Sequence, residues 1–309
     1  MASLKVPRQL PTPAEDAENL RKACLGWGTD EKAIISILGH RDSDQRELIR
    51  LAYEELYQED LYKLLESETS GVFKNAVYLW ILDPADRDAV LARTALKKVI
   101  PDIRVIIEIA CVKTPLELLA VKRAYHARYN RSLEEDLLVA LVGQYRYNGV
   151  ESDKSLALAE AKILHDNIQG KEFIHEEILR ILSTRSVAQL NATFNSYKEV
   201  YGSSITKHFL GYVGDPMDEY LSALRTTVRC IRAPHKYFQK VLRNAIKGLG
   251  TDEDTLTRII ITHAEKDLKE IMELYHKRNN GSLKDAVAND TSGEYKDFLL
   301  TLLGEYKEF

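Results

Sequence analysis

The chain has 309 residues, of which 45% are hydrophobic and 29% charged, and its formal net charge at pH 7 is −4. Length and composition indicate a soluble globular protein with room for about two ordinary domains. No stretch reaches the ~20 apolar residues of a membrane span, and the polar residues 1–19 lack the pattern of a signal peptide. Basic residues are dispersed, so no nucleic-acid partner is expected, and binding to an anionic membrane would need a local patch or a cation.

The three cysteines, Cys24, Cys111 and Cys230, are scattered and odd in number. This pattern argues against a disulfide framework and fits a reducing compartment.

The predicted elements are helices from the start of the chain. Residues 12–15, Thr-Pro-Ala-Glu, form a capping box with proline at the first helical position. Thr29 lies where the N-cap of the next helix belongs, and Ile34, Ile35 and Leu38 follow with inward-facing spacing. Asp42 with Gln45 predicts a further helix start. Since no stretch alternates with period two between hairpin turns, we predict an all-α fold.

Four apolar positions recur along the chain at offsets of 72, 72 and 78 residues. The recurring sets are Tyr53, Tyr125, Tyr197 and Tyr275; Ile34, Ile106, Ile178 and Leu256; Ile37, Ile109, Ile181 and Ile259; and Leu61, Leu133, Ile205 and Leu283. The sequence therefore predicts four repeats of about five short helices each. The expected boundaries are a short N-terminal segment, 1–12, followed by repeats one to four at 13–83, 84–155, 156–232 and 233–309.

One motif occurs in the first and last repeats only. Residues 26–31, Gly-Trp-Gly-Thr-Asp-Glu, recur as Gly-Leu-Gly-Thr-Asp-Glu at 248–253, with Thr251 in the place of Thr29. After each Thr come 38 residues and then a carboxylate followed by Thr-Ser-Gly, Glu68 in the first copy and Asp290 in the second. Gly-x-Gly can bend tightly enough to aim several carbonyls at one point, and a carboxylate would complete a set of hard oxygen ligands. Such a set suits calcium.

The middle repeats keep the apolar positions and lose the motif. Repeat two has Ile100-Pro101 and Ala140 in these places, and repeat three has Glu172-Phe173 and Tyr212. The motif is thus separable from the fold, which favours a functional interpretation over a helix-entry turn that merely needs glycine.

These features resemble the annexin family, and the plant annexins in particular. The resemblance covers residues 11–309 and rests on the two Gly-x-Gly-Thr motifs with their acids, on His40-Arg41-Asp42 with Gln45-Arg46, on Lys113-Thr114-Pro115 and on Trp27. It implies five-helix repeats wound into a curved disc with calcium loops on the convex face. It also implies the ligands: the carbonyls of Cys24, Gly26 and Gly28 with the Glu68 carboxylate, and the carbonyls of Ile246, Gly248 and Gly250 with Asp290.

By the same resemblance the chain is a calcium-dependent binder of anionic phospholipid membranes. Three carbonyls and one bidentate carboxylate give about five oxygens, short of calcium's 6–8, so water or lipid phosphate would fill the rest. We expect Trp27 and Leu249 at the loop tips, with Lys247 beside the second, to contact the membrane. The implied protein is cytoplasmic, recruited to the plasma membrane or endomembranes with calcium, and a monomer or weak homo-oligomer with links to stress responses.

Other functions stay open at this point. The resemblance brings a suggested peroxidase-like role for His40, although a capping or salt-bridge role at a helix end is commoner. Cys111 and Cys230 match a redox sulfur pair suggested for plant annexins, and nucleotide hydrolysis lacks the G-x-x-x-x-G-K-[ST] loop it would need.

Two further alternatives are an ion-conducting protein, which a fourfold repeat with charged residues near its interfaces permits, and an actin-binding protein, which the resemblance suggests. Asp88, Glu108 and Lys113 would line the pore of a calcium-permeable channel. F-actin is a further partner, although Ile231-Arg232-Ala233 departs from the Ile-Arg-Ile triplet at its last position.

Overall fold

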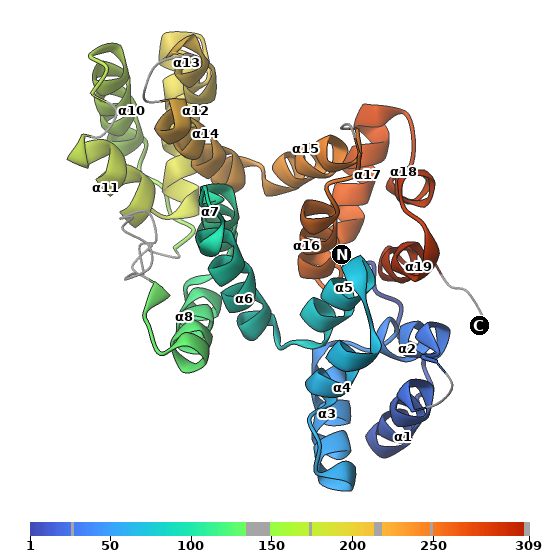
Figure 1. The fold of residues 1–309 in the computed structure, drawn as a ribbon. Helices are drawn as coiled ribbons and strands as arrows, with labels where there is room; N and C mark the ends of the chain where they lie inside the picture. The colour runs from blue at the N-terminus through green and yellow to red at the C-terminus, as the bar shows by residue number, and fades with distance from the viewer. Residues whose placement is uncertain (26–27, 134–148, 173–174, 213–217, 248–249, 306–309) are drawn as a thin grey trace. The chain divides into compact units, whose positions relative to one another are not determined.

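A computed structural model describes the chain except residues 26–27, 134–148, 173–174, 213–217, 248–249 and 306–309. Every regular element in the described residues is helical, so the all-α prediction is confirmed (Figure 1). The chain divides into two compact units, one formed by Met1–Arg87 with His235–Phe309 and the other by Asp88–Pro234.

The first unit holds repeats one and four, and each shows the five helices expected. Repeat one comprises α1 (Pro13–Cys24), α2 (Glu31–Leu38), α3 (Ser43–Tyr57), α4 (Leu61–Glu68) and α5 (Gly71–Ile81). Repeat four comprises α15 (Pro234–Ile246), α16 (Glu253–His263), α17 (Leu268–Asn279), α18 (Leu283–Asp290) and α19 (Gly293–Leu302).

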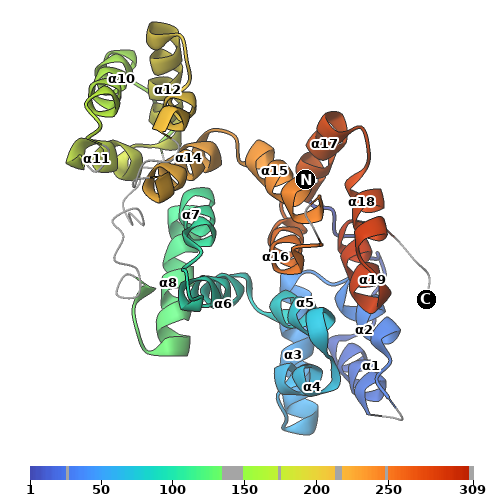
Figure 2. The same ribbon diagram turned by 45° about the horizontal axis from the view of Figure 1, so that its top comes forward.

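The two repeats of this unit are distant in sequence and adjacent in space. Helix α5 contacts α16 and α19, and α19 also contacts α2 (Figures 1 and 2). The buried Ser3 side chain donates to the Leu302 carbonyl at 2.6 Å, which fixes the N-terminal segment on repeat four. Trp80 is fully buried on α5, as expected from its apolar stretch, and its Nε1–H donates to the Leu38 carbonyl at 2.7 Å.

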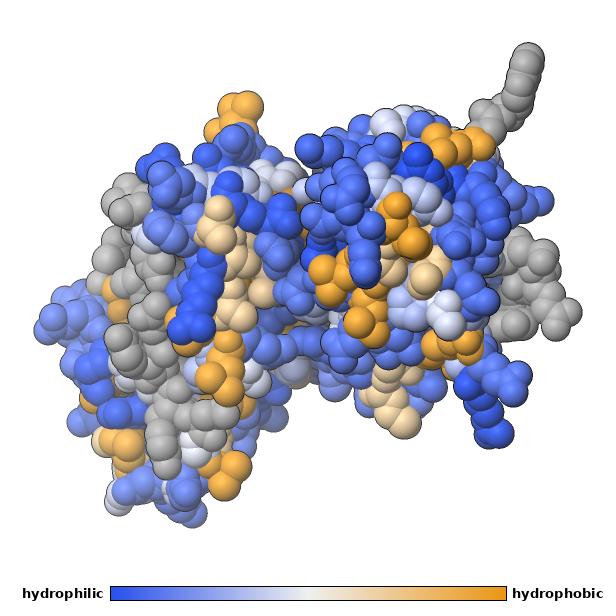
Figure 3. Space-filling view, turned by 90° about the horizontal axis from the view of Figure 1, so that it is seen from below, coloured by the Kyte–Doolittle hydropathy of each residue, from blue (hydrophilic) through white to orange (hydrophobic). Residues whose placement is uncertain are grey.

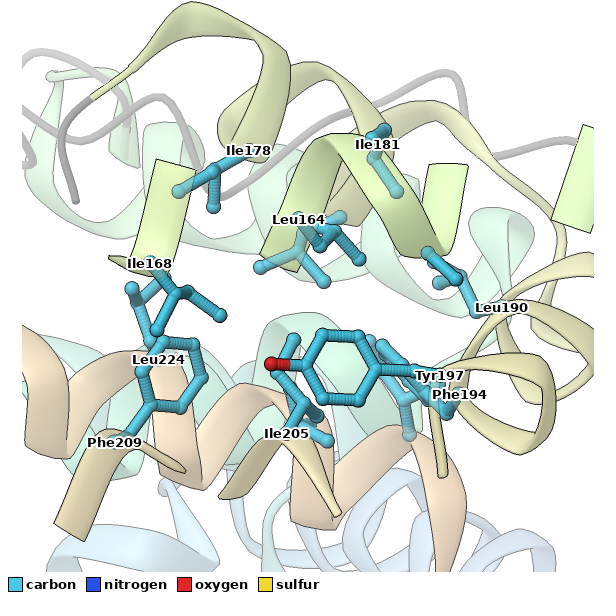
Figure 4. Packing of buried hydrophobic residues seen from close by; sticks show 14 of the residues in the cluster. Leu164, Ile168, Ile178, Ile181, Leu190, Phe194, Tyr197, Ile205, Phe209 and Leu224 are labelled. Atoms are coloured by element: carbon cyan, nitrogen blue, oxygen red, sulfur yellow. The ribbon is translucent and has the colours of Figure 1, made fainter. Parts of the chain in front are cut away.

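The second unit holds repeats two and three. Its described helices are α6 (Pro84–Lys97), which begins just before the unit boundary, α7 (Ile103–Val112), α8 (Pro115–Tyr129), α10 (Lys154–Gln169), α11 (Glu176–Thr184), α12 (Val187–Tyr201), α13 (Ile205–His208), the 3-10 helix η1 (Phe209–Tyr212) and α14 (Asp218–Arg232). Apolar side chains of α10 to α14 form one core, with Leu164, Phe194 and Leu224 among its members (Figure 4).

Helix starts follow the capping residues that the sequence shows. The Thr12 and Glu15 side chains bond each other's backbone N–H groups at the start of α1, and Asp42 and Gln45 do the same for α3. Repeat two adds a third capping box at α8, between Thr114 and Glu117. Each box satisfies N–H groups that an isolated helix end leaves without partners.

A pair with at least one buried side chain recurs at one position of every repeat, where it joins the first helix to the end of the second. The pairs are Asp16–Arg41, Asp88–Lys113 and Glu160–Arg185, and in repeat four the rings of Phe238 and His263, which contact at an interplanar angle of 56°. The Asp16 and Arg41 side chains are 3% and 6% exposed, and their bond is bidentate at 2.7 and 2.9 Å. Since the pair recurs in all four repeats, we interpret it as part of the repeat's structure.

In the described part of the chain, no helix is both long and apolar enough to cross a bilayer. On the face drawn in Figure 3, apolar side chains form small patches among hydrophilic ones.

Candidate metal centres in repeats one and four

The two acids of the repeated motif end equivalent helices. Glu68 is the last residue of α4 and Asp290 the last of α18, and both are half-buried. The Thr-Ser-Gly that follows turns the chain into the next helix, with Gly71 and Gly293 at φ of 58° and 61°. Such positive φ values favour glycine, so the turn fixes where each carboxylate can lie.

A threonine from the Gly-x-Gly-Thr segment holds each acid. The Thr29 hydroxyl donates to the Glu68 carbonyl at 2.8 Å and lies 3.4 Å from its carboxylate Oε2. Thr251 does the same with Asp290, at 2.9 Å to the carbonyl and 2.6 Å to Oδ2. We call this contact between a threonine hydroxyl and the acid the threonine latch. It is present in both repeats and joins the loop to the distant acid, as the spacing predicted.

The threonines are not N-caps, so that expectation was wrong. Asp30 caps α2 by accepting from the Ala33 N–H, and Asp252 caps α16 by accepting from the Thr255 N–H. An aspartate can take this role because its short carboxylate reaches the first-turn N–H groups. The threonine hydroxyl is thereby available for the acid across the loop.

Both loops close on the same backbone contact. The Asp30 N–H donates to the Ala23 carbonyl at 2.8 Å, and the Asp252 N–H donates to the Ala245 carbonyl at 2.9 Å. Gly28 and Gly250 have φ values of 94° and 93°, and a Cβ built on either meets no atom within 4 Å. Glycine is needed here for the backbone angle rather than for space.

The other expected ligands lie beside these loops or outside the described residues. Cys24 and Ile246 are the last residues of α1 and α15, where helix carbonyls have no partner within the helix. Lys247 is exposed. Gly26, Trp27, Gly248 and Leu249 lie outside the described residues.

The Cys24 thiol is affected by burial and by the charge of the first acid. Burial, and after it the negative charge of Glu68, raises the pKa of the Cys24 thiol to about 12. The thiol is thus protonated, and only the backbone carbonyl of Cys24 is suited to a hard cation.

These donors fit calcium better than a transition metal. Carbonyl and carboxylate oxygens are hard ligands, and flexible loops suit calcium's variable geometry. Among the described residues, no three His, Cys, Asp or Glu side chains gather as a metal cluster. A site built on one carboxylate and backbone carbonyls does not require such a cluster.

Comparison with known proteins decides the family. The annexin family model matches residues 15–80, 87–147, 159–210 and 237–302. The chain belongs to the annexin family. It is 60% identical over 302 residues to an annexin-like protein, RJ4, of Fragaria ananassa, covering 94% of this chain and 95% of that one. This similarity groups it with the plant annexins, as Trp27 and the two retained motifs predicted.

Solved annexin structures share the fold. The structure of annexin III matches with a TM-score of 0.90 at 30% identity, covering 99% of this chain and 98% of that one. A calcium-bound annexin, (Sm)1, matches with a TM-score of 0.83 at 30% identity, covering 99% and 93%.

The middle repeats of this annexin differ at the same loop. Ile100 is 76% exposed between α6 and α7, and Pro101 stands in the place of the threonine that holds the acid. Ala140 and Phe173 lie outside the described residues. Proline has no hydroxyl, so repeat two lacks the latch as well as the acid.

The residues of the pore hypothesis lie within repeat two. Lys113 pairs with Asp88, whose side chain is 1% exposed, at the recurring position described above. Glu108 on α7 is also buried. This recurrence favours a structural role for the Asp88–Lys113 pair.

Of the residues of the redox hypotheses, His40 and Cys230 are buried and Cys111 is partly buried. His40 is 5% exposed, its Nδ1 lies 3.0 Å from the Ser36 carbonyl, and burial lowers the pKa of the imidazole. Cys111 and Cys230 form no disulfide and lie on the contacting helices α7 and α14, and burial raises the pKa of Cys230. A buried thiol of raised pKa is poorly reactive, which favours a packing role for Cys230.

Proposed function

We propose that this annexin binds calcium in the loops of repeats one and four and docks through that calcium on anionic phospholipid. The observation that carries the proposal is the duplicated latch, in which Thr29 and Thr251 hold Glu68 and Asp290 beside a glycine loop. The calcium-bound state named for the related (Sm)1 structure supports it.

Each site would use one carboxylate with the carbonyls of its loop. Repeat one would contribute the carbonyls of Cys24, Gly26 and Gly28, and repeat four those of Ile246, Gly248 and Gly250. Because this set leaves coordination positions for water or a lipid phosphate, calcium would bind more tightly when a membrane completes it. The cation would also offset repulsion between a chain of formal charge −4 and an anionic surface.

Side chains at the loops would complete the membrane contact. Trp27 and Leu249 would enter the interface, where aromatic and apolar groups are stabilised. Lys247 is exposed and would meet a phosphate headgroup. We propose that the protein is cytoplasmic and moves to the plasma membrane or endomembranes when calcium rises.

The test is co-sedimentation with phosphatidylserine vesicles across a calcium series. Glu68→Gln and Asp290→Asn should each raise the calcium needed for half-maximal binding by at least about tenfold, since even outer-shell losses weaken metal sites about 10–100-fold. The double substitution should nearly abolish binding. Glu66→Gln and Glu294→Gln remove exposed acids near the same loops and should change little. Binding of wild type that is equal in calcium and in chelator would contradict the proposal.

A further inference from the structure

In repeats one and two, an arginine on the first helix of the repeat contacts two tyrosines on its third helix. The two tyrosines are one turn apart, and the contact holds the two helices together. In repeat one, Arg21 donates to the Tyr53 hydroxyl at 2.9 Å and its guanidinium lies 4.1 Å from the Tyr57 ring centroid. In repeat two the same contacts, at 3.3 and 5.2 Å, are made by Arg93 with Tyr125 and Tyr129. Arginine stays charged at any pH the protein meets.

Repeat three has a titratable group in this place. His165 on α10 stacks on Tyr201, with ring centroids 3.6 Å apart and an interplanar angle of 6°. Its Nδ1 lies 3.3 Å from the Tyr197 hydroxyl, and the same hydroxyl lies 2.6 Å from Nδ1 of His208 on α13. One phenol thus joins imidazoles from two helices.

The phenol is part of the repeat-three core. Tyr197 is fully buried on α12, and its ring lies close to the labelled Phe194 and Ile205 in Figure 4. A change in the bonding of this hydroxyl therefore acts on the packing of α10, α12 and α13.

We propose that His165, Tyr197 and His208 form an acid-sensitive hydrogen-bonded cluster, the histidine latch, in repeat three. With both imidazoles neutral, the Tyr197 hydroxyl donates to one Nδ1 and accepts an N–H from the other, and the 2.6 Å contact assigns His208 as the acceptor. Protonation turns His208 Nδ1 into a donor and removes the O–H···N bond. It also adds a positive charge beside His165.

Burial and the neighbouring basic groups both favour the neutral form of His208. Burial lowers the pKa of His208, and the charges of His165 and of Lys207 on α13 lower it further. The pKa of Tyr201, which stacks on His165, is raised first by burial and then by the negative charge of Asp166 on α10. His165 and Lys207 are both basic groups, so each disfavours the protonated form of His208.

The sign of the pH effect follows from linkage. Because the pKa of His208 is lower in the folded than in the unfolded state, the folded state binds fewer protons between the two values. The stability that the neutral histidine latch contributes is fully present above about pH 6.5. It is lost as the pH falls through the folded pKa, so α12 and α13 should open more readily at pH 5.5 than at pH 7.5.

The test is hydrogen exchange of the full chain without calcium at these two pH values, corrected for intrinsic rates. His208→Leu supplies the residue that repeat one has in this register, Leu64, and His208→Gln keeps a non-titrating acceptor. The opening of α12 and α13 at acid pH should increase about three- to tenfold more in wild type than in either variant, since one pKa unit corresponds to a factor of ten. Helix α3, held by Arg21, is the internal control.

A second measurement does not depend on the His208 variants. Imidazole titration by NMR should give His208 a pKa below about 6.5, and His165→Gln should raise it. Equal acid responses in wild type and variants, or a His208 that titrates at or above its ordinary value, would overturn the histidine latch.

Discussion

Thr29 and Thr251 show how much a single hydroxyl adds to the Gly-x-Gly-Thr motif. The spacing predicted that loop and acid meet, but it assigned the threonines to helix capping. The structure gives the capping role to Asp30 and Asp252. Aspartate and threonine are both good N-caps, so the sequence alone does not rank two adjacent candidates. What decides between them is Glu68, 39 positions after Thr29, which bonds the threonine hydroxyl.

The threonine latch leads to a prediction at this scale. Thr29→Val and Thr251→Val should each raise the calcium needed for vesicle binding by about tenfold, because they remove an outer-shell bond that orients a ligand. Thr29→Ser and Thr251→Ser keep the hydroxyl and should restore most of the affinity. Isothermal calorimetry with calcium and co-sedimentation with vesicles measure the effect. Valine variants with wild-type calcium dependence would show that the hydroxyl does not position the acid.

At the scale of elements, helix starts were predictable and buried pairs were not. Capping boxes at Thr12 and Asp42 are local patterns, and the structure confirms both. Asp88 and Lys113 are 25 residues apart, and their pairing appears only when α6 and α7 are placed together. Asp88 and Lys113 occupy the positions of Asp16 and Arg41 in the repeat, which was visible in the sequence. A comparison of the repeats at these positions would have indicated a structural pair instead of a pore lining.

The buried pair predicts a large effect on stability. Lys113→Met should lower the free energy of unfolding by about 3–5 kcal/mol, because it leaves the Asp88 carboxylate buried without its partner. Lys113→Met with Asp88→Asn should recover part of this loss. Arg104→Met removes an exposed guanidinium that pairs with the partly buried Asp102 and should cost about 1 kcal/mol or less. Urea unfolding gives the values, and a Lys113→Met protein as stable as wild type would mean that the pair is not structural.

At the scale of the whole molecule, the two candidate calcium sites lie in the same compact unit. Repeats one and four form Met1–Arg87 with His235–Phe309, while repeats two and three form the unit without the motif. The fourfold repeat was evident from the apolar registers, whereas the grouping of the first repeat with the last was not. It depends on long-range contacts such as α5 with α16, which local patterns do not encode.

This division predicts that calcium stabilises one unit selectively. A ligand that binds only the folded state stabilises it by about 2.7 kcal/mol per site at a concentration of 100 times Kd. Both candidate sites lie in the first unit, so millimolar calcium should slow hydrogen exchange in α1–α5 and α15–α19, most strongly around Glu68 and Asp290. Exchange in α7, α8 and α10–α14 should change little. Glu68→Gln with Asp290→Asn should remove the protection, and magnesium, which demands near-octahedral geometry, should reproduce little of it. Protection of equal size in both units would show that calcium binds outside the two loops.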